Sequence, residues 1–232
     1  MPTTQSPHHN LKAACLTSGG LDSIALLFLL VKEYKSIYPI YIKTNLNFEE
    51  AEIYYLNKFI TSCQNKSLQP LTILNLDIRD LYTNHWSINH VNIPDYTSLD
   101  DSVYLPGRNI ILLSKSAIWC AQNDINFIAL GHLQGNPFPD ASQQFMDTIA
   151  HAFSIGLNSK LAIIRPFINL NKAKVIKLAK NAPLNLSFSC IDPQLSEDQI
   201  FIHCGNCHKC AERIKAFNEA RITDLTIYAK SH

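Results

Sequence analysis

The sequence has no long hydrophobic run, and this absence bears on where the protein works. The longest apolar stretch, residues 24–31, is far shorter than the roughly 20 residues that a membrane-spanning helix needs. Residues 1–12 are polar and include no apolar segment of the signal-peptide kind. We therefore expect a cytoplasmic protein without a membrane partner.

The chain also has no large excess of charge of either sign. Its 20 Lys and Arg residues face 19 Asp and Glu residues, so the formal net charge is +1. Such a balance gives no strong field toward nucleic acid, which is therefore not an expected partner. A composition of 47% hydrophobic and 17% charged residues favours a folded core, and 232 residues suit one large domain with at most a small addition.

One short motif joins an expected strand to an expected helix. It reads Ser18-Gly19-Gly20-Leu21-Asp22-Ser23, after the apolar run 12–16 and at the start of the leucine-rich run 21–34. The two glycines allow a sharp bend that exposes backbone amides, and the helix brings the positive end of its dipole to the same place. The motif therefore predicts an anion-binding turn. The alternative is a plain tight turn with Ser or Asp as a helix cap.

The motif lacks the Gly-Lys-Ser/Thr ending of a Walker A loop, so the lysine that binds the γ-phosphate is missing. It resembles instead the pyrophosphate loop of the ATP-pyrophosphatase (PP-loop) superfamily, whose members split ATP into AMP and pyrophosphate. This resemblance implies an ATP site. The residues expected to contact the nucleotide are Thr17, Ser18, Gly19, Gly20, Leu21, Asp22, Ser23, Ile24 and Gly131.

Strands and helices are expected to alternate, which predicts an α/β fold with an open, mostly parallel sheet and helices on both faces. Ligands of such sheets lie beyond the carboxyl ends of the strands, where the 18–23 motif falls. Residues 79–101 are expected to be irregular. The expected strands are 12–16, 36–44, 71–76, 127–132 and 162–166, the last in the chain; the expected helices are 21–34, 48–66, 110–121, 143–156, 171–182 and 211–217.

Two basic residues stand near helix N-termini, where a cation opposes the helix dipole. Arg108 follows Pro106-Gly107, and Lys172 lies in the first turn of the helix expected at 171–182. Both positions favour an anionic partner. The alternatives are an Arg108 paired with Asp100 or Asp101, and a Lys172 solvated at the surface.

A loop follows the expected strand 127–132. Residues 133–142 contain two prolines and a glycine, which exclude regular structure, and a loop at the carboxyl end of a strand often carries function. Phe138 can stack on a flat ring. The predicted substrate-binding residues are Arg108, Asn109, His132, Phe138 and Asp140.

Seven cysteines fit reduced thiols or a metal site better than disulfides in a cytoplasmic protein. Cys204, Cys207 and Cys210 are spaced three apart, and Cys190 lies just upstream. Four thiolates are the set that tetrahedral zinc prefers, and they leave no open position, so the predicted role is structural. Reduced cysteines without metal, or a redox pair, are the alternatives. We expect a tail at 1–12, a nucleotide-binding domain at 13–183 and a helical zinc-binding region at 184–232.

Taken together, these motifs resemble the 7-cyano-7-deazaguanine synthase family over nearly the whole chain. The segments that carry the resemblance are 18–23, 93–96, Pro106-Gly107-Arg108-Asn109, 151–156, Lys172-Ala173 and the four cysteines with Arg213. The resemblance implies a ligase that uses ATP and ammonia to convert the carboxylate of 7-carboxy-7-deazaguanine into a nitrile, through an adenylate and an amide. The chain has no glutaminase-like segment, so free ammonia or a partner must supply the nitrogen.

The resemblance also implies roles for individual residues. Ser18, Asp22 and Ser23, with the two glycines between them, would hold the leaving pyrophosphate together with Mg²⁺. Lys172 and Arg108 would offset phosphate charge as it develops. Catalysis would then rest on positioning and electrostatics, with Ser18, Asp22, Ser23, Arg108 and Lys172 as the catalytic set.

The chain departs from the family in its substrate loop, where Ala141-Ser142 stands in place of a Cys-Arg pair. A site that reads a heterocycle by hydrogen bonds depends on such groups, so a ligase for another acid, or for a protein partner, is one alternative. A tRNA-thiolating enzyme and a non-catalytic zinc-binding module are two others. The sequence leaves a homodimer open.

Overall fold

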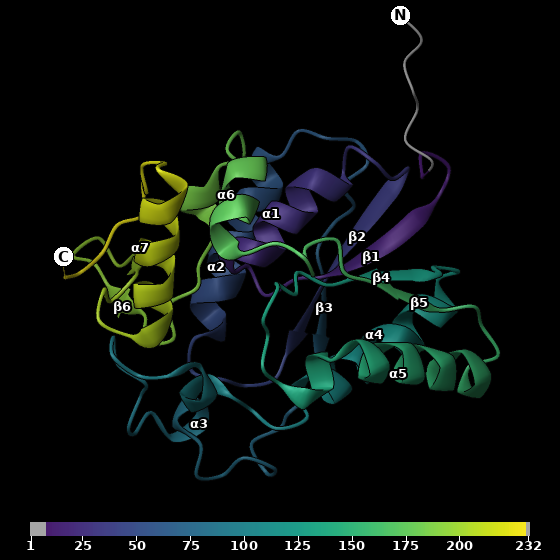
Figure 1. Ribbon diagram of the computed structural model, residues 1–232, viewed down its shortest axis with the longest axis horizontal. Helices are drawn as coiled ribbons and strands as arrows, with labels where there is room; N and C mark the ends of the chain where they lie inside the picture. Colours follow the sequence, from purple (N-terminus) through teal and green to yellow (C-terminus); the bar gives the residue numbers. More distant parts are fainter. Residues whose placement is uncertain (1–7, 231–232) are drawn as a thin grey trace, which may run out of the picture.

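The computed structural model describes residues 8–230, so most of the expected tail at 1–12 lies outside the described residues. Its centre is a parallel sheet with strand order β3-β2-β1-β4-β5. The strands run through the middle of Figure 1 with helices on either side. The α/β prediction is thus confirmed. The strands are β1 Lys12–Leu16, β2 Ser36–Lys43, β3 Thr72–Asn75, β4 Phe127–Ala129 and β5 Ala162–Ile164.

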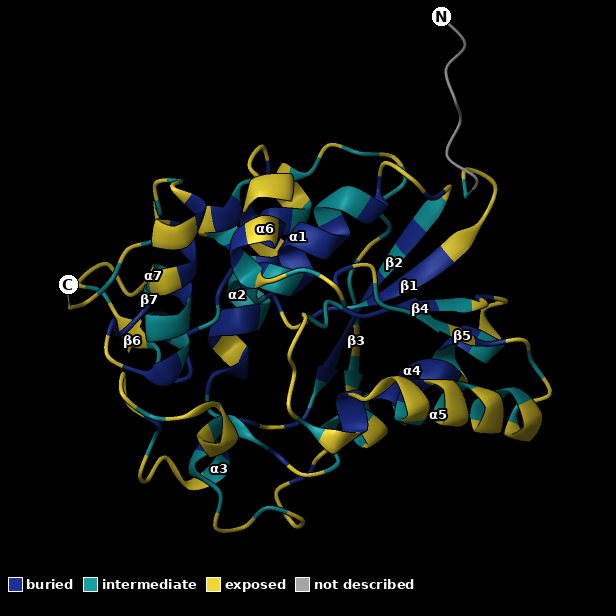
Figure 2. Cartoon of the chain, viewed as in Figure 1, coloured by how far each residue is buried: buried dark blue, intermediate teal, exposed yellow. Residues whose placement is uncertain are grey.

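Alternate residues of the central strands point to opposite faces of the sheet, as strand geometry requires. Ala13 and Cys15 join one core cluster with α1, α2, α6 and α7, whereas Ala14 joins a second cluster with α4 and α5. Figure 2 shows α1 almost wholly buried and α5 exposed along its outer side. The bounds are α1 Leu21–Leu30, α2 Glu49–Ser62, α4 Arg108–Gln122, α5 Gln143–Gly156, α6 Lys172–Leu178 and α7 His208–Ala220.

Several expected bounds were wrong, mostly because helices end earlier than their apolar pattern. The helix expected at 21–34 ends at Leu30, and Val31 and Tyr34 stay buried in the turn that follows. The helix expected at 171–182 ends at Leu178. The segment 79–101 contains one helical turn, α3 Trp86–Asn89, with His85 as its cap, and short 3₁₀ turns lie at Asp100–Val103, Pro139–Ala141 and Leu184–Leu186.

The strand at 162–164 is not the last in the chain. A two-stranded antiparallel ladder follows, formed by β6 Gln194–Leu195 and β7 Phe201–Ile202. Strands of two residues are too short to leave an alternating pattern, which is why the sequence did not predict them. Within residues 8–230, no helix combines the length and apolar character that crossing a bilayer requires.

The C-terminal segment packs against the turn at residues 18–23. Phe188 donates its backbone N–H to the carbonyl of Gly19 at 2.8 Å. Ala216 and Phe217 of α7 belong to the same core cluster as Leu21 and Ile24 of α1. Arg213 of α7 is 1% exposed; it donates to Ser187 Oγ at 2.7 Å and pairs with Asp224 at 3.2 Å. These contacts join α7 to the same core that buries α1.

Candidate active site

The turn between β1 and α1 is built on Gly19, whose φ of +77° favours glycine. A side chain there would also collide with α2, because a Cβ would lie 2.9 Å from the Glu52 carbonyl oxygen. Gly20 is the N-cap of α1, and Ser23 donates its hydroxyl to the Gly20 carbonyl at 3.0 Å. Since the first N–H groups of a helix have no intrahelical partner, the turn presents backbone donors, as predicted.

Gly131 follows β4 and lies directly against this turn. A Cβ at Gly131 would sit 3.2 Å from the Asp22 carbonyl carbon and 3.3 Å from the Ser23 nitrogen. A side chain at residue 131 would therefore displace the first turn of α1 by a few tenths of an ångström.

Replacing Gly131 with alanine is expected to lower kcat/KM for ATP about 10- to 100-fold, because a small displacement of the turn misplaces the reacting groups. Gly156→Ala is the matched control, since a Cβ at that helical glycine meets nothing within 4 Å. Steady-state kinetics of both variants measures the difference. Equal kinetics of the two variants would contradict the assigned position of Gly131 in the nucleotide site.

A chain of charged side chains runs from the turn to α7. Lys172 Nζ lies 3.1 Å from Asp22 Oδ2 and 2.6 Å from Glu212 Oε1. Lys209 lies 2.9 Å from the second oxygen of Glu212. The Lys172 side chain is 14% exposed, so the surface-lysine alternative is wrong. The anions that Lys172 meets here are two carboxylates of the protein itself.

The groups in this chain shift one another's pKa. Burial pulls the pKa of Lys172 down, but Asp22 and Glu212 outweigh burial and hold it above its usual value. Burial raises the pKa of Glu212, but Lys172 and Lys209 more than reverse that effect and lower it. For Asp22, burial prevails and the pKa is raised despite Lys172. Asp22 Oδ1 is buried without a hydrogen-bond partner among the described residues.

Arg108 begins α4 on the opposite side, after Gly107, whose φ is +75°. Its alternative partner Asp100 instead pairs with His208, with 3.0 Å between Oδ1 and Nε2. Within residues 8–230, Arg108 forms no ion pair with Asp100 or Asp101, and its Nε is buried without a hydrogen-bond partner. The guanidinium is therefore available to a ligand.

Asp140 has a structural contact that the sequence did not predict. Its Oδ2 accepts from the Asn109 backbone N–H at 2.9 Å, and its carbonyl accepts from Asn109 Nδ2 at 3.2 Å. This carboxylate therefore caps the N-terminus of α4, where a negative charge is favourable. Asp140 Oδ1 has no partner among the described residues, so a substrate contact stays a prediction.

His132 and Phe138 are the remaining predicted substrate-binding residues. Burial, with the charge of Arg165, lowers the pKa of His132 to about 4, so the ring is neutral at pH 7. Its Nδ1 is buried and has no hydrogen-bond partner in the described part of the chain. Phe138 stacks on Tyr104, with 4.5 Å between ring centroids and 18° between planes.

One cavity of about 400 Å³ is lined on one side by the β1–α1 turn and Lys172, and on the other by Arg108, His132 and Phe138. The sequence reasoning missed Tyr41, Glu52, Lys209 and Glu212, which also line it. No local motif marks these four residues. Their closeness to Arg108 or Lys172 becomes visible only once α2 and α7 are placed. The predicted residues that line the cavity are Thr17, Ser18, Asp22, Ser23, Arg108, Asn109, Gly131, His132, Phe138 and Lys172. The predicted residues outside its lining are Gly19, Gly20, Leu21, Ile24 and Asp140.

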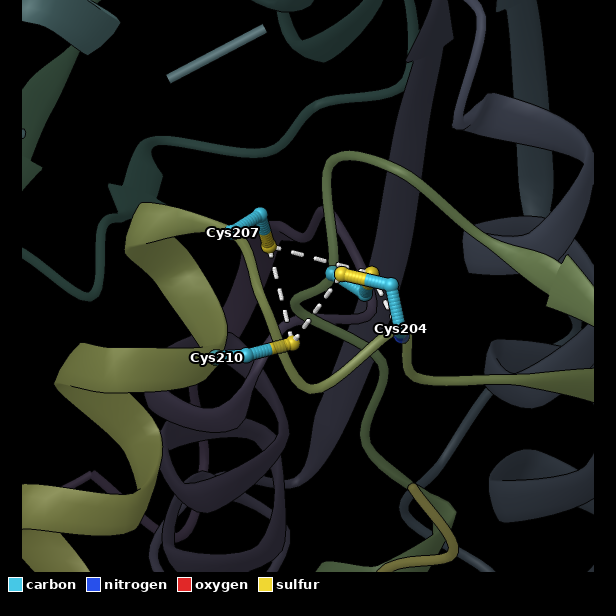
Figure 3. Close-up of side chains that lie close together, drawn as sticks. Cys204, Cys207 and Cys210 are labelled. Atoms are coloured by element: carbon cyan, nitrogen blue, oxygen red, sulfur yellow. Dashed lines mark hydrogen bonds between the residues drawn. The ribbon is translucent and has the colours of Figure 1, made fainter. Parts of the chain in front are cut away.

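The four cysteines expected to hold a metal converge next to α7. Their sulfur atoms all lie within 4.8 Å of one another, and Figure 3 shows three of them pointing toward a common centre. The Sγ separations include 3.8 Å for Cys190–Cys207 and 3.9 Å for Cys204–Cys210. Zn–S bonds of about 2.3 Å in a tetrahedron place sulfurs about 3.8 Å apart. The donor set therefore fits a four-coordinate metal.

The backbone around the cluster suits thiolates. Cys190 Sγ accepts N–H groups from Cys204 at 3.2 Å and from Asp192 at 3.4 Å. Gly205 has a φ of +78°, and any Cβ there would collide with the carbonyl of Lys230. The C-terminal segment is held by Ala229, which donates to the His203 carbonyl at 2.8 Å. Of the remaining cysteines, Cys15 and Cys120 are buried in the core and Cys63 is only partly buried.

Two curated relatives match nearly the whole chain. A relative from Pyrococcus abyssi named 7-cyano-7-deazaguanine synthase is 30% identical over 94% of this chain and 97% of its own length. A protein of the same name from Acetivibrio thermocellus is 31% identical over the same shares. The solved structure of a U34-tRNA thiolase from Methanococcus maripaludis covers 74% of this chain and 57% of its own, at 16% identity and a TM-score of 0.48. That degree of likeness does not discriminate among activities.

A family model also covers most of the chain. A model described as "Queuosine biosynthesis protein QueC" matches residues 12–221, which include the β1–α1 turn, both sides of the cavity and all four cysteines. The chain therefore belongs to the QueC family.

Proposed function

We propose that the protein is an ATP-dependent ligase that converts 7-carboxy-7-deazaguanine and ammonia into 7-cyano-7-deazaguanine. The observation that carries the proposal is the single cavity in which Asp22 and Lys172 face Arg108, His132 and Phe138. Its 400 Å³ is within the range of small-molecule sites. The names of the curated relatives support the same activity.

A carboxylate is a poor electrophile, so the reaction must first transfer AMP to it. The β1–α1 turn would bind the leaving pyrophosphate through its backbone N–H groups and the hydroxyls of Ser18 and Ser23, the latter turning from the Gly20 carbonyl to the ligand. Lys172 and Arg108 would counter the charge that develops on the phosphates. The buried and unpartnered Oδ1 of Asp22 fits a ligand of Mg²⁺, which would supply further positive charge at the pyrophosphate oxygens.

Ammonia then displaces AMP to give an amide, and a second adenylation activates the amide oxygen. Loss of the second AMP and of the amide protons leaves the nitrile. His132, neutral at pH 7, and Phe138 would hold the flat heterocycle beside Arg108. The four cysteines would hold a structural zinc outside the reaction.

The test is incubation of the protein with ATP, Mg²⁺, ammonium and 7-carboxy-7-deazaguanine, followed by mass spectrometry. We expect AMP, pyrophosphate and the nitrile. ATP–pyrophosphate exchange with a panel of carboxylic acids is run in parallel, because Ala141-Ser142 leave the substrate loop without the family's arginine. If exchange occurs with another acid and not with 7-carboxy-7-deazaguanine, the other acid becomes the proposed substrate.

The burial of Cys15 and Cys120 disfavours a tRNA-thiolating activity for either thiol. Cys15 and Cys120 are fully buried, burial raises the pKa of each thiol to about 12, and neither lines the cavity. A reactive cysteine needs the opposite setting, with an accessible and readily ionised thiol.

A further inference from the structure

Two buried glutamates on α2 differ in how their carboxylates are used. Glu49 is 2% exposed and accepts from the Thr44 backbone at 2.7 Å, from the Thr44 hydroxyl at 2.6 Å and from the Asn45 backbone at 2.8 Å. Glu49 thus fixes the chain after β2. It has no place in the lining of the cavity.

Glu52, one turn later, is 7% exposed and lines the cavity. Among the described residues its hydrogen-bond donor is the Tyr41 hydroxyl, 2.6 Å from Oε2. A buried acid with one donor and an opening to a cavity is suited to meet a ligand, because buried carboxylates otherwise collect several partners.

The charged and titratable groups that face Glu52 come from three elements. They are Tyr41 of β2, Arg108 of α4 and Glu49 of α2 itself. Burial raises the pKa of Glu52 to about 8, although Arg108 and Tyr41 lower it in part. Burial, followed by the charge of Glu52, also holds the pKa of Tyr41 well above its usual value, so the phenol remains a donor. Glu52 can therefore exchange a proton near neutral pH.

We propose that Glu52, held in place by Tyr41, is the base that takes the proton from the incoming ammonium ion. This inference rests on the proposed function, because it assigns the nitrogen-transfer step of the same cavity. Glu52 would be a catalytic residue and Tyr41 a positioning residue.

Ammonium has no free electron pair and cannot attack a carbon. In the proposed step, one N–H bond of ammonium breaks, its proton moves to the Glu52 carboxylate, and the electron pair stays on nitrogen. That pair forms the C–N bond to the acyl carbon of the adenylate, and the C–O bond breaks as AMP leaves with its electrons. The second proton that nitrogen sheds passes to solvent through the open cavity, and the amide results. The positive charge of ammonium itself favours the ionised form of Glu52 as the ion enters.

The test separates adenylation from nitrogen transfer. Glu52→Gln keeps the shape of the side chain and can still accept from Tyr41, but it cannot take a proton. We expect its ATP–pyrophosphate exchange with 7-carboxy-7-deazaguanine, measured without ammonia, to stay within about threefold of the unmodified protein. Formation of amide and nitrile from ammonium at pH 7 should fall about 100-fold or more, the usual contribution of a general base.

Hydroxylamine distinguishes a base from a structural residue. It is unprotonated at pH 7 and needs no base, so Glu52→Gln should form the hydroxamate within about threefold of the unmodified rate. Raising the pH supplies free ammonia, so it should reduce the difference between the ammonium rates of Glu52→Gln and the unmodified protein. Tyr41→Phe should show a smaller loss, about tenfold, in the ammonium reaction alone.

Glu49→Gln is the matched control on the same helix, with folding followed by circular dichroism. It should lower the melting temperature while leaving the ratio of ammonium to hydroxylamine rates unchanged. The inference would be overturned if folded Glu52→Gln used ammonium as fast as the unmodified protein. It would also be overturned if exchange, hydroxamate formation and nitrile formation all fell equally. Absence of exchange in the unmodified protein would overturn the proposed function and this inference with it.

Discussion

Replacing Lys172 with methionine is expected to reduce ATP–pyrophosphate exchange about 100- to 1,000-fold, the usual effect of removing one preorganised electrostatic group. The ammonium group stands between Asp22 and Glu212, at 3.1 and 2.6 Å. Without it, the two carboxylates repel each other and repel the phosphates of ATP. We also expect a loss of about 1–3 kcal/mol in the free energy of unfolding, because both carboxylates lose a largely buried partner.

The control for Lys172→Met is Lys174→Met. Lys174 lies on the same helix but is exposed, and its removal should leave exchange and stability within experimental error. Exchange is normalised to folded protein, measured by circular dichroism, so that a stability loss is not read as a catalytic one. A folded Lys172→Met protein with unaltered exchange would show that this lysine only holds α1 and α7 together.

Removing the metal that we propose at the four cysteines is expected to disable the cavity around Lys172 from a distance. Cys207 is the N-cap of α7, and Cys210 lies in its first turn, two residues before Glu212 and three before Arg213. Cys207→Ser, or treatment with a strong chelator, should cost about 4–5 kcal/mol of stability and lower the melting temperature by roughly 8–20 °C. Exchange should fall as well, because Glu212 would no longer hold Lys172.

Three measurements check this prediction. They are metal content by mass spectrometry, the melting temperature and exchange, each before and after chelation. Cys63→Ser serves as the control, since Cys63 is outside the cluster and only partly buried. A metal-free protein with the original melting temperature would contradict the structural role of the cluster.

The sequence could predict what is local. The β1–α1 turn, the separate strands and helices, and the cysteine spacing each depend on residues close together in the chain. The structure confirms the turn, the convergence of the cysteines and the parallel sheet, which was predicted from the alternation of strands and helices. Helix ends were less predictable, because buried residues such as Val31 and Tyr34 continue the apolar pattern past the last helical residue.

The partners of the site residues could not be predicted, because they come from distant segments. Lys172 meets Glu212, 40 residues later, and Glu52 meets Tyr41 only because β2 and α2 lie against each other. Asp140 was expected to bind substrate, yet its contact with Asn109 arises from a loop folding back over the start of α4. Side-chain roles in an α/β site depend on which strand ends adjoin, and residue spacing does not contain that information.

The crossing of Lys230 over Gly205 has a practical consequence for handling the protein. Ala229 and Lys230 donate backbone N–H groups to the carbonyls of His203 and of Cys204, which is one of the four clustered cysteines. An affinity tag fused at the C-terminus, or trimming by a carboxypeptidase, would act directly on the segment that lies over the four-cysteine cluster. Fusion ahead of β1, which lies apart from α7 in Figure 1, is the better design for preparing metal-loaded protein.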